Sequence, residues 1–168
     1  SKNGSIGGHI VDSFVLYSSD LISYSSWSTN TPKTLVKQII DAYTDLIYTE
    51  VQEGKTVSFL SMVTFNGEKS TTERYPQGYY FYEVSKNLNL DVNLVSSVLT
   101  RYKELIEREL LSKNIVVVYG LVKFTPLSSG KVSVKSSTRL GKNNVKVRAK
   151  LNPYWFCEVS KFVDMGEV

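Results

Sequence analysis

Hydrophobic residues in two long stretches of the chain recur at the three- and four-residue spacing of an amphipathic helix. The first stretch follows Thr31 and a proline and ends at Gly54, and the second follows Asp91 and ends at about Ser112. Thr and Asp are favoured at helix N-caps, proline at the first helical position, and Gly or Asn in the left-handed residue that ends a helix. The pattern therefore predicts two long helices, with Asn114 taking the left-handed conformation after the second.

The residues around the first long helix predict shorter elements. Val11 to Trp27 is apolar and serine-rich and favours a helix. Thr56 to Phe65 is β-branched and aromatic and favours a strand, followed by Asn66-Gly67, a hairpin turn signal. Ser70 to Tyr82 would supply the returning strand, and Glu83 to Leu88 a short helix.

The residues after the second long helix predict more strands. Ile115 to Phe124 is a continuous run rich in β-branched residues, and Val132-Ser133-Val134 and Val145-Lys146-Val147 alternate between apolar and polar positions. The last two would form a hairpin around a bend rich in Ser, Gly and Asn. Pro153 to Cys157 reads as an aromatic strand and Glu158 to Val163 as a short closing helix.

The chain contains an internal repeat, because Thr34–Phe65 aligns with Asn93–Phe124 at a shift of 59 without a gap. A second similarity, Tyr80–Lys86 with Trp155–Lys161, lies at a shift of 75, so the second copy would carry about sixteen extra residues. The repeat predicts an α+β fold of two units, residues 1–82 and 83–168, which pack about a pseudo-twofold axis like a dimer fused into one chain. The nine identical pairs in the first alignment are Leu35/Leu94, Val36/Val95, Tyr43/Tyr102, Leu46/Leu105, Ile47/Ile106, Glu50/Glu109, Val57/Val116, Val63/Val122 and Phe65/Phe124.

Basic residues are concentrated in the second unit. Leu111 to Cys157 contains no Asp or Glu and nine Lys or Arg, so it carries +9 against −5 for the rest of a chain whose net charge is +4. Such a block predicts an anionic partner and says little about fold. The competing interpretation is a solvated hairpin whose lysines discourage edge-to-edge pairing.

The order of elements and the motifs at the arm resemble the HU/IHF family of DNA-bending proteins, once in each repeat. Arg139-Leu140-Gly141-Lys142-Asn143-Asn144 is similar to the family's arm tip, Arg-x-Gly-Arg-Asn-Pro, and Thr64-Phe65 keeps a family pair. The resemblance implies one extended β-hairpin arm in the second repeat and only a short arm in the first. Asn144 replaces the proline that wedges between base steps in the family, and Asn is not a rigid apolar wedge.

The resemblance also implies a contact surface on the arm, for nucleic acid or a protein partner. The chain looks like the IHF-like virion proteins of crAss-like tailed phages, which implies a structural role near the head–tail neck, with other virion proteins or copies of itself as partners. The alternative is an architectural, DNA-bending protein of the cytoplasm or nucleoid that binds double-stranded DNA. The predicted contact residues are Lys131, Lys135, Arg139, Leu140, Lys142, Asn143, Asn144, Lys146, Arg148 and Lys150.

The sequence gives no indication of an enzyme. It has no phosphate-binding glycine loop, metal-ligand spacing or apolar run long enough to span a membrane, so we expect no catalytic residue, cofactor, small-molecule substrate or membrane partner. His9 lies far from other ligand types, and Cys157 fits a buried small hydrophobe. Tyr154-Trp155-Phe156 could stack on bases but fits a core strand better.

Overall fold

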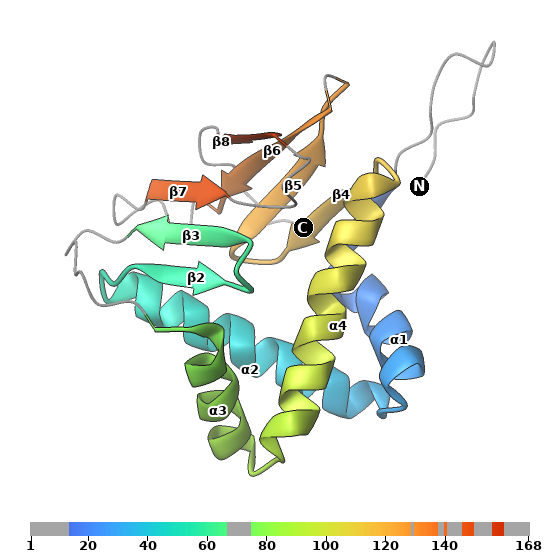
Figure 1. Cartoon of the computed structure of the whole chain (residues 1–168), viewed down its shortest axis with the longest axis vertical. Helices are drawn as coiled ribbons and strands as arrows, with labels where there is room; N and C mark the ends of the chain where they lie inside the picture. The colour runs from blue at the N-terminus through green and yellow to red at the C-terminus, as the bar shows by residue number, and fades with distance from the viewer. Residues whose placement is uncertain are drawn as a thin grey trace.

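The computed structural model describes residues 14–66, 75–128, 130–137, 140, 146–149 and 156–159, with only the backbone for 66, 146–149 and 156–159. These residues form an α+β fold in which the helices gather on one side and the strands on the other (Figure 1). None of the described helices is both long and apolar enough to cross a lipid bilayer.

The described part of the chain contains four helices and two sheets. A five-stranded sheet has the order β1-β4-β5-β6-β8, and a three-stranded sheet has the order β2-β3-β7. The helices are α1 (Ser18–Thr29), α2 (Lys33–Gln52), α3 (Gln77–Leu88) and α4 (Val92–Leu111). The strands are β1 (Val15–Tyr17), β2 (Val57–Phe59), β3 (Val63–Asn66), β4 (Ile115–Val118), β5 (Val122–Pro126), β6 (Lys131–Ser136), β7 (Lys146–Ala149) and β8 (Phe156–Val159).

Residues 15–66, here the first half, and residues 75–126, the second half, share two helices and two strands at the shift of 59, whereas β1 has no counterpart among the described residues. Helices α1 and α3 have 12 residues each and begin 59 positions apart, and α2 and α4 have 20 residues each at the same shift. Asn30 and Asn89 end the two short helices in the left-handed conformation. The correspondence thus extends beyond the aligned segment, because it includes the short helices.

The two long helices lie where the sequence predicts them, with small corrections at their ends. Asp91 caps α4, since its side chain accepts a hydrogen bond from the backbone N–H of Asn93 at 2.7 Å. At α2 the N-cap is Pro32, and the side chain of Thr31 bonds the carbonyl of Thr29 instead. The left-handed residue after α4 is Lys113, with φ of 67°, and not Asn114.

Three predictions for the first half are wrong. Val11–Trp27 is not one helix, because its described part contains β1 before α1 begins. Thr56–Phe65 is not one strand, because a turn at Leu60 and Ser61 divides it into β2 and β3, with Met62 N–H bonded to the Phe59 carbonyl at 2.9 Å.

The third wrong prediction is the returning strand from Ser70 to Tyr82. Its last residues belong to α3, because Tyr80 and Val84 lie one helical turn apart and are both buried. The unit boundary predicted between residues 82 and 83 therefore lies inside a continuous helix.

The predicted hairpin arm is also corrected, because its two strands lie in different sheets. Strand β6 pairs with β5 and, in parallel, with β8, whereas β7 pairs antiparallel with β3 of the first half. Tyr80–Lys86 is helical while Phe156–Val159 is a strand, so the second similarity does not correspond in structure. Glu158 and Val159 belong to β8, not to a closing helix, and residues 160–163 lie outside the described part.

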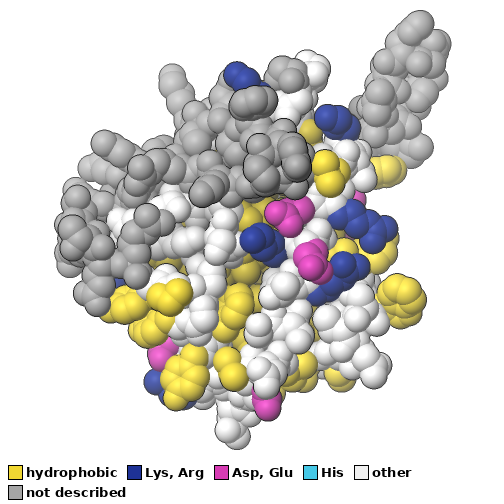
Figure 2. Space-filling model, viewed as in Figure 1, with side chains coloured by type: hydrophobic (Ala, Val, Ile, Leu, Met, Phe, Trp, Pro, Cys, Tyr) yellow, Lys and Arg dark blue, Asp and Glu magenta, His cyan; other side chains and the backbone are white. Residues whose placement is uncertain are grey.

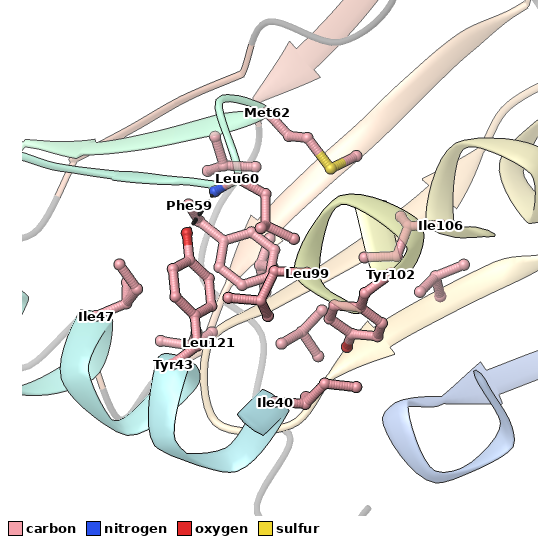
Figure 3. Packing of buried hydrophobic residues seen from close by; sticks show 14 of the residues in the cluster. Ile40, Tyr43, Ile47, Phe59, Leu60, Met62, Leu99, Tyr102, Ile106 and Leu121 are labelled. Carbon is pink, nitrogen blue, oxygen red and sulfur yellow. Dashed lines mark hydrogen bonds between the residues drawn. The ribbon is translucent and has the colours of Figure 1, made fainter. Parts of the chain in front are cut away.

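A single hydrophobic cluster joins both halves, and its tyrosines make reciprocal contacts. In the first half, Tyr43 donates a hydrogen bond to Gln77 of α3. In the second half, the hydroxyl of Tyr102 bonds Ser18 of α1 at 2.7 Å. Tyr43 and Tyr102 are 59 residues apart, as are Ser18 and Gln77, so each half gives the other the same contact. Figure 3 shows both rings within the packed core.

Candidate nucleic-acid or partner interface

Three lysines lie on one face of the β5-β6 ladder. Lys123 of β5 is directly opposite Lys135 of β6, and Lys131 lies four residues before Lys135 on the same strand. Residues opposite each other in an antiparallel pair have Cβ atoms about 5 Å apart, and four strand residues span about 13 Å. The lysines therefore form a row of two close charges and a third farther along; we call Lys123, Lys131 and Lys135 the sheet lysines.

The alternation of the two strands places the sheet lysines away from the core. Val122 and Phe124 on β5, and Val132 and Val134 on β6, are buried in the hydrophobic cluster. Successive side chains of a strand point to opposite faces, so the residues between these apolar positions lie on the other face. Lys131 is exposed and the other two lysines are half-buried.

The facing pair is electrostatically unfavourable by itself. Like charges directly opposite on a ladder are destabilising, and none of the sheet lysines forms an ion pair within the described residues. The ion pairs that the described residues do form lie on the helices and at Lys55. A phosphate or carboxylate placed between Lys123 and Lys135 would relieve this repulsion, so the arrangement fits an anionic partner.

The structure separates the predicted contact residues into groups. Lys131 and Lys135 lie on the ladder just described. Lys146 and Arg148 lie on β7, where their backbones pair with Asn66 and Thr64, and their side chains are outside the described part. Arg139, Lys142, Asn143, Asn144 and Lys150 lie outside the described residues, as do His9, Tyr154 and Trp155.

Leu140 corrects the prediction for the arm tip. Its side chain is fully buried in the hydrophobic cluster, and its backbone N–H bonds the Ser137 carbonyl at 2.9 Å. An apolar residue between Arg139 and Lys142 was assigned to the contact surface because of the motif around it. Burial of the leucine removes apolar area from water, so the side chain belongs to the core and not to the contact surface.

Sequence reasoning missed Lys123 as a site residue. It belongs to the acid-free block, but it lies in an apolar strand outside the predicted arm. The missing signal was the pairing of β5 with β6, because only the register shows that Lys123 faces Lys135. A second missed group lies on the helices, where Tyr24, Trp27 and two arginines line a groove.

The buried tyrosine side chains are neutral phenols that form hydrogen bonds. Burial raises the pKa of Tyr102 to about 12, although its hydrogen bond with Ser18 opposes this. Burial also raises the pKa of Tyr43, whose oxygen accepts a hydrogen bond from Leu60 N–H at 2.7 Å. Both phenols therefore stay protonated at neutral pH. Among the described residues, no three His, Cys, Asp or Glu side chains are grouped so as to hold a metal ion.

Comparison with protein-family models, with curated proteins and with solved structures finds no match to this chain. Function is therefore inferred from the residues and their arrangement.

Proposed function

We propose that this protein is a non-enzymatic structural component of a tailed-phage virion, built from two HU/IHF-like units in tandem. Its partners would be other virion proteins or copies of itself. Its basic residues would contact a neighbouring subunit or packaged DNA. The proposed location is the virion, at the neck or ring between head and tail.

The tandem-unit part of the proposal is supported by the reciprocal contacts between the halves. In a twofold-symmetric dimer, residue i of one subunit contacts residue j of the other, and j contacts i in return. Tyr43 with Gln77 and Tyr102 with Ser18 follow this rule at the shift of 59. A fused dimer of a small α+β unit is the simplest origin of such a pattern.

The single observation that favours assembly over DNA bending is the position of β7. Proteins that clasp and bend DNA need projecting elements that enter the groove. Strand β7, with Lys146 and Arg148, is hydrogen-bonded to β3 of the first half along Val63–Asn66. The backbone of this stretch is thus part of the body, and it does not form a projecting hairpin with β6.

DNA binding remains the second candidate function, and the sheet lysines favour it. Three cations that form no ion pair within the described residues could contact phosphates from the side of a duplex. That contact would be sequence-independent, because phosphate contacts carry no base information directly. It is compatible with a structural role beside packaged DNA.

The two functions differ in how strongly the isolated protein binds and bends a duplex. A labelled duplex of about 30 base pairs would be titrated by anisotropy between about 50 and 200 mM salt, with end-to-end energy transfer as the measure of bending. We expect weak binding, a log–log salt slope of about −3 or shallower, and no bending, since three phosphate contacts give about −0.9 each. Tight binding with a slope beyond about −6 and a clear bend would replace the assembly proposal with the DNA-bending one.

A variant pair assigns any binding to the proposed surface. Lys123→Gln with Lys135→Gln should reduce the salt slope by about two. The matched control is Lys86→Gln with Lys103→Gln, which removes the same charge from the helices and should leave the slope nearly unchanged. Equal effects of the two variants would show that only net charge matters.

The assembly itself is tested by the mass of the protein in solution and by its presence in particles. Native mass measurement over a concentration series should show discrete closed oligomers, because a repeated heterologous contact that closes gives a ring. A chain that stays monomeric at high concentration, and that is absent from purified particles, would overturn the proposal.

A further inference from the structure

A groove lies between α1 and α4, away from the sheet lysines. It has a volume of about 370 Å³ and is lined by Ser23, Tyr24 and Trp27 from α1 and by Arg101 and Arg108 from α4. The space-filling view shows basic and acidic side chains gathered over α4, with apolar side chains beside them (Figure 2). The groove therefore combines aromatic surface with guanidinium groups.

The aromatic wall is unusually exposed for its size. Trp27 is 85% exposed and Tyr24 is 53% exposed, while Leu21, Ile22 and Ser25 of the same helix are buried. Tryptophan offers one of the largest apolar areas of any side chain, so covering this wall would remove much apolar surface from water. Trp, Tyr and Arg are also the residues most enriched at the energetic centres of protein interfaces.

The two arginines differ in how they are held. Arg101 donates from Nε to the Ser28 hydroxyl at 2.9 Å and from one terminal nitrogen to Glu104 at 3.4 Å, so its guanidinium is anchored. Arg108 is exposed and forms no side-chain hydrogen bond or ion pair within the described residues. The two arginines are seven positions apart in the sequence, which places them about 10 Å apart along α4.

Mixed charge beside the groove favours a protein partner over a nucleic acid. Glu104 lies on α4 between the two arginines, with its side chain 55% exposed, and it would repel a continuous phosphate backbone. A peptide can instead place single carboxylates on the arginines and an apolar side chain on the aromatic wall. Arg forms bidentate pairs with carboxylates, which gives such a contact a defined geometry.

We propose that the α1–α4 groove is a docking site for an acidic peptide segment of a partner protein, with an apolar side chain between two carboxylates. One carboxylate would bind Arg108 and the other the anchored Arg101, and the apolar side chain would pack on Trp27 and Tyr24. In a segment in the polyproline II conformation, which has three residues per turn and rises about 3.1 Å per residue, the side chains of residues i and i+3 lie on one face about 9 Å apart, close to the spacing of the arginines. The site does not depend on the sheet lysines or on the proposed place in a virion.

Intrinsic fluorescence tests the site directly. In a Trp155→Phe background, Trp27 is the single tryptophan of the sequence. The probe is the capped peptide Asp-Leu-Phe-Glu, and its matched control is the neutral peptide Asn-Leu-Phe-Gln. We expect a saturable change in Trp27 emission with the acidic peptide, and binding about tenfold weaker with the neutral one, because charged hydrogen bonds contribute most to such contacts.

Variants assign the binding to named side chains. Arg108→Gln should weaken binding of the acidic peptide about tenfold. The control is Lys103→Gln, which removes a cation of the same helix outside the groove and should leave the affinity unchanged. In a separate assay with labelled peptide, Trp27→Ala should lose binding. Arg108 and Trp27 are exposed, so unchanged circular dichroism and melting would show that these variants remain folded.

Four results would overturn the proposal. Equal affinity for acidic and neutral peptides, or no saturable change up to several millimolar, would remove the acidic peptide as occupant. Self-association that Trp27→Ala abolishes would assign the groove to a second copy of the chain. Binding of a single-stranded oligonucleotide that depends on Trp27 would assign it to base stacking instead.

Discussion

The first and second halves of the chain share two helices and two strands at the shift of 59, but some equivalent positions carry different side chains. In the first half, buried Glu50 accepts a hydrogen bond from Lys55 at 2.9 Å and lies 3.4 Å from the Tyr80 hydroxyl. In the second half, Glu109 accepts a hydrogen bond from the Asn114 side chain at 2.9 Å. Asn114 is the counterpart of Lys55 at the shift of 59, so an ion pair has become a neutral amide contact.

The amide contact gives the second half a connection that a lysine cannot make. The side-chain oxygen of Asn114 accepts a hydrogen bond from the Phe14 backbone at 3.1 Å, and the Phe14 carbonyl accepts one from Ile115 at 2.8 Å. These two bonds align β1 with β4. A lysine at position 114 could not accept the bond from Phe14, because lysine offers donors only, while an amide offers both a donor and an acceptor. The Asn114 side chain therefore adds a hydrogen bond at the end of the parallel β1–β4 pair. The equivalent core positions of the two halves therefore keep their packing, while the polar positions at Lys55 and Asn114 differ.

The largest effect is expected when a buried aromatic ring is removed at the same position of either half. Phe65 of β3 and Phe124 of β5 are both fully buried. We expect Phe65→Ala and Phe124→Ala each to lower the free energy of unfolding by about 3–5 kcal/mol, because each leaves a cavity in the shared cluster. Denaturation followed by circular dichroism should show one transition in both variants. Two separated transitions would mean that the halves fold independently.

Equivalent tyrosines should differ in a predictable way. Tyr43→Phe leaves the buried Leu60 N–H without its acceptor and should cost about 1–3 kcal/mol. Tyr102→Phe removes a bond to Ser18, which is half-buried, and should cost about 0.5–1.5 kcal/mol. Exposed Tyr24→Phe serves as the control and should be nearly neutral in urea unfolding. A larger loss of unfolding free energy for Tyr102→Phe than for Tyr43→Phe would contradict this expectation.

The same tyrosines predict a loss of stability at alkaline pH. The pKa of Tyr102 in the folded protein is raised to about 12, and that of Tyr43 is also raised, whereas an unfolded tyrosine titrates near 10. Above about pH 10 the unfolded chain releases protons that the folded chain retains, so stability falls as pH rises. Each tyrosine should contribute on the order of 1 kcal/mol per pH unit in that window. Unfolding curves of the two Tyr→Phe variants should depend less on pH there, and an unchanged dependence would contradict this origin.

The smallest expected effect concerns the ends of the long helices. Gly54 and Lys113 are equivalent, with φ of 83° and 67°, but only glycine adopts this conformation without strain. Lys113→Gly should raise the unfolding free energy by about 0.5–1 kcal/mol, and Gly54→Ala should lower it by about 1 kcal/mol. Lys113→Ala is the control, because it removes the charge but keeps the Cβ. A gain for this control equal to that of the glycine variant would point to charge and not to backbone strain.

Part of the candidate site could be predicted from sequence, and part required the fold. The acid-free block indicated a basic surface, and Lys131 and Lys135 lie on one. The pairing of Lys123 with Lys135 depends on register, which a sequence with several similar valine-rich strands does not specify. The groove between α1 and α4 joins residues about 75 positions apart, and no local pattern relates Trp27 to Arg101.

The sequence by itself determined the long helices and the shift of 59, because helix periodicity, capping residues and repeated core positions are local properties. The tertiary structure decided whether the short aromatic stretches are helices or strands. The stretch around Tyr80 is helical, and one face of α3 packs into the shared core. It also decided that β7 joins β3 rather than β6. Strand pairing depends on which hydrophobic faces the whole chain can bury together, and that balance is set across the molecule.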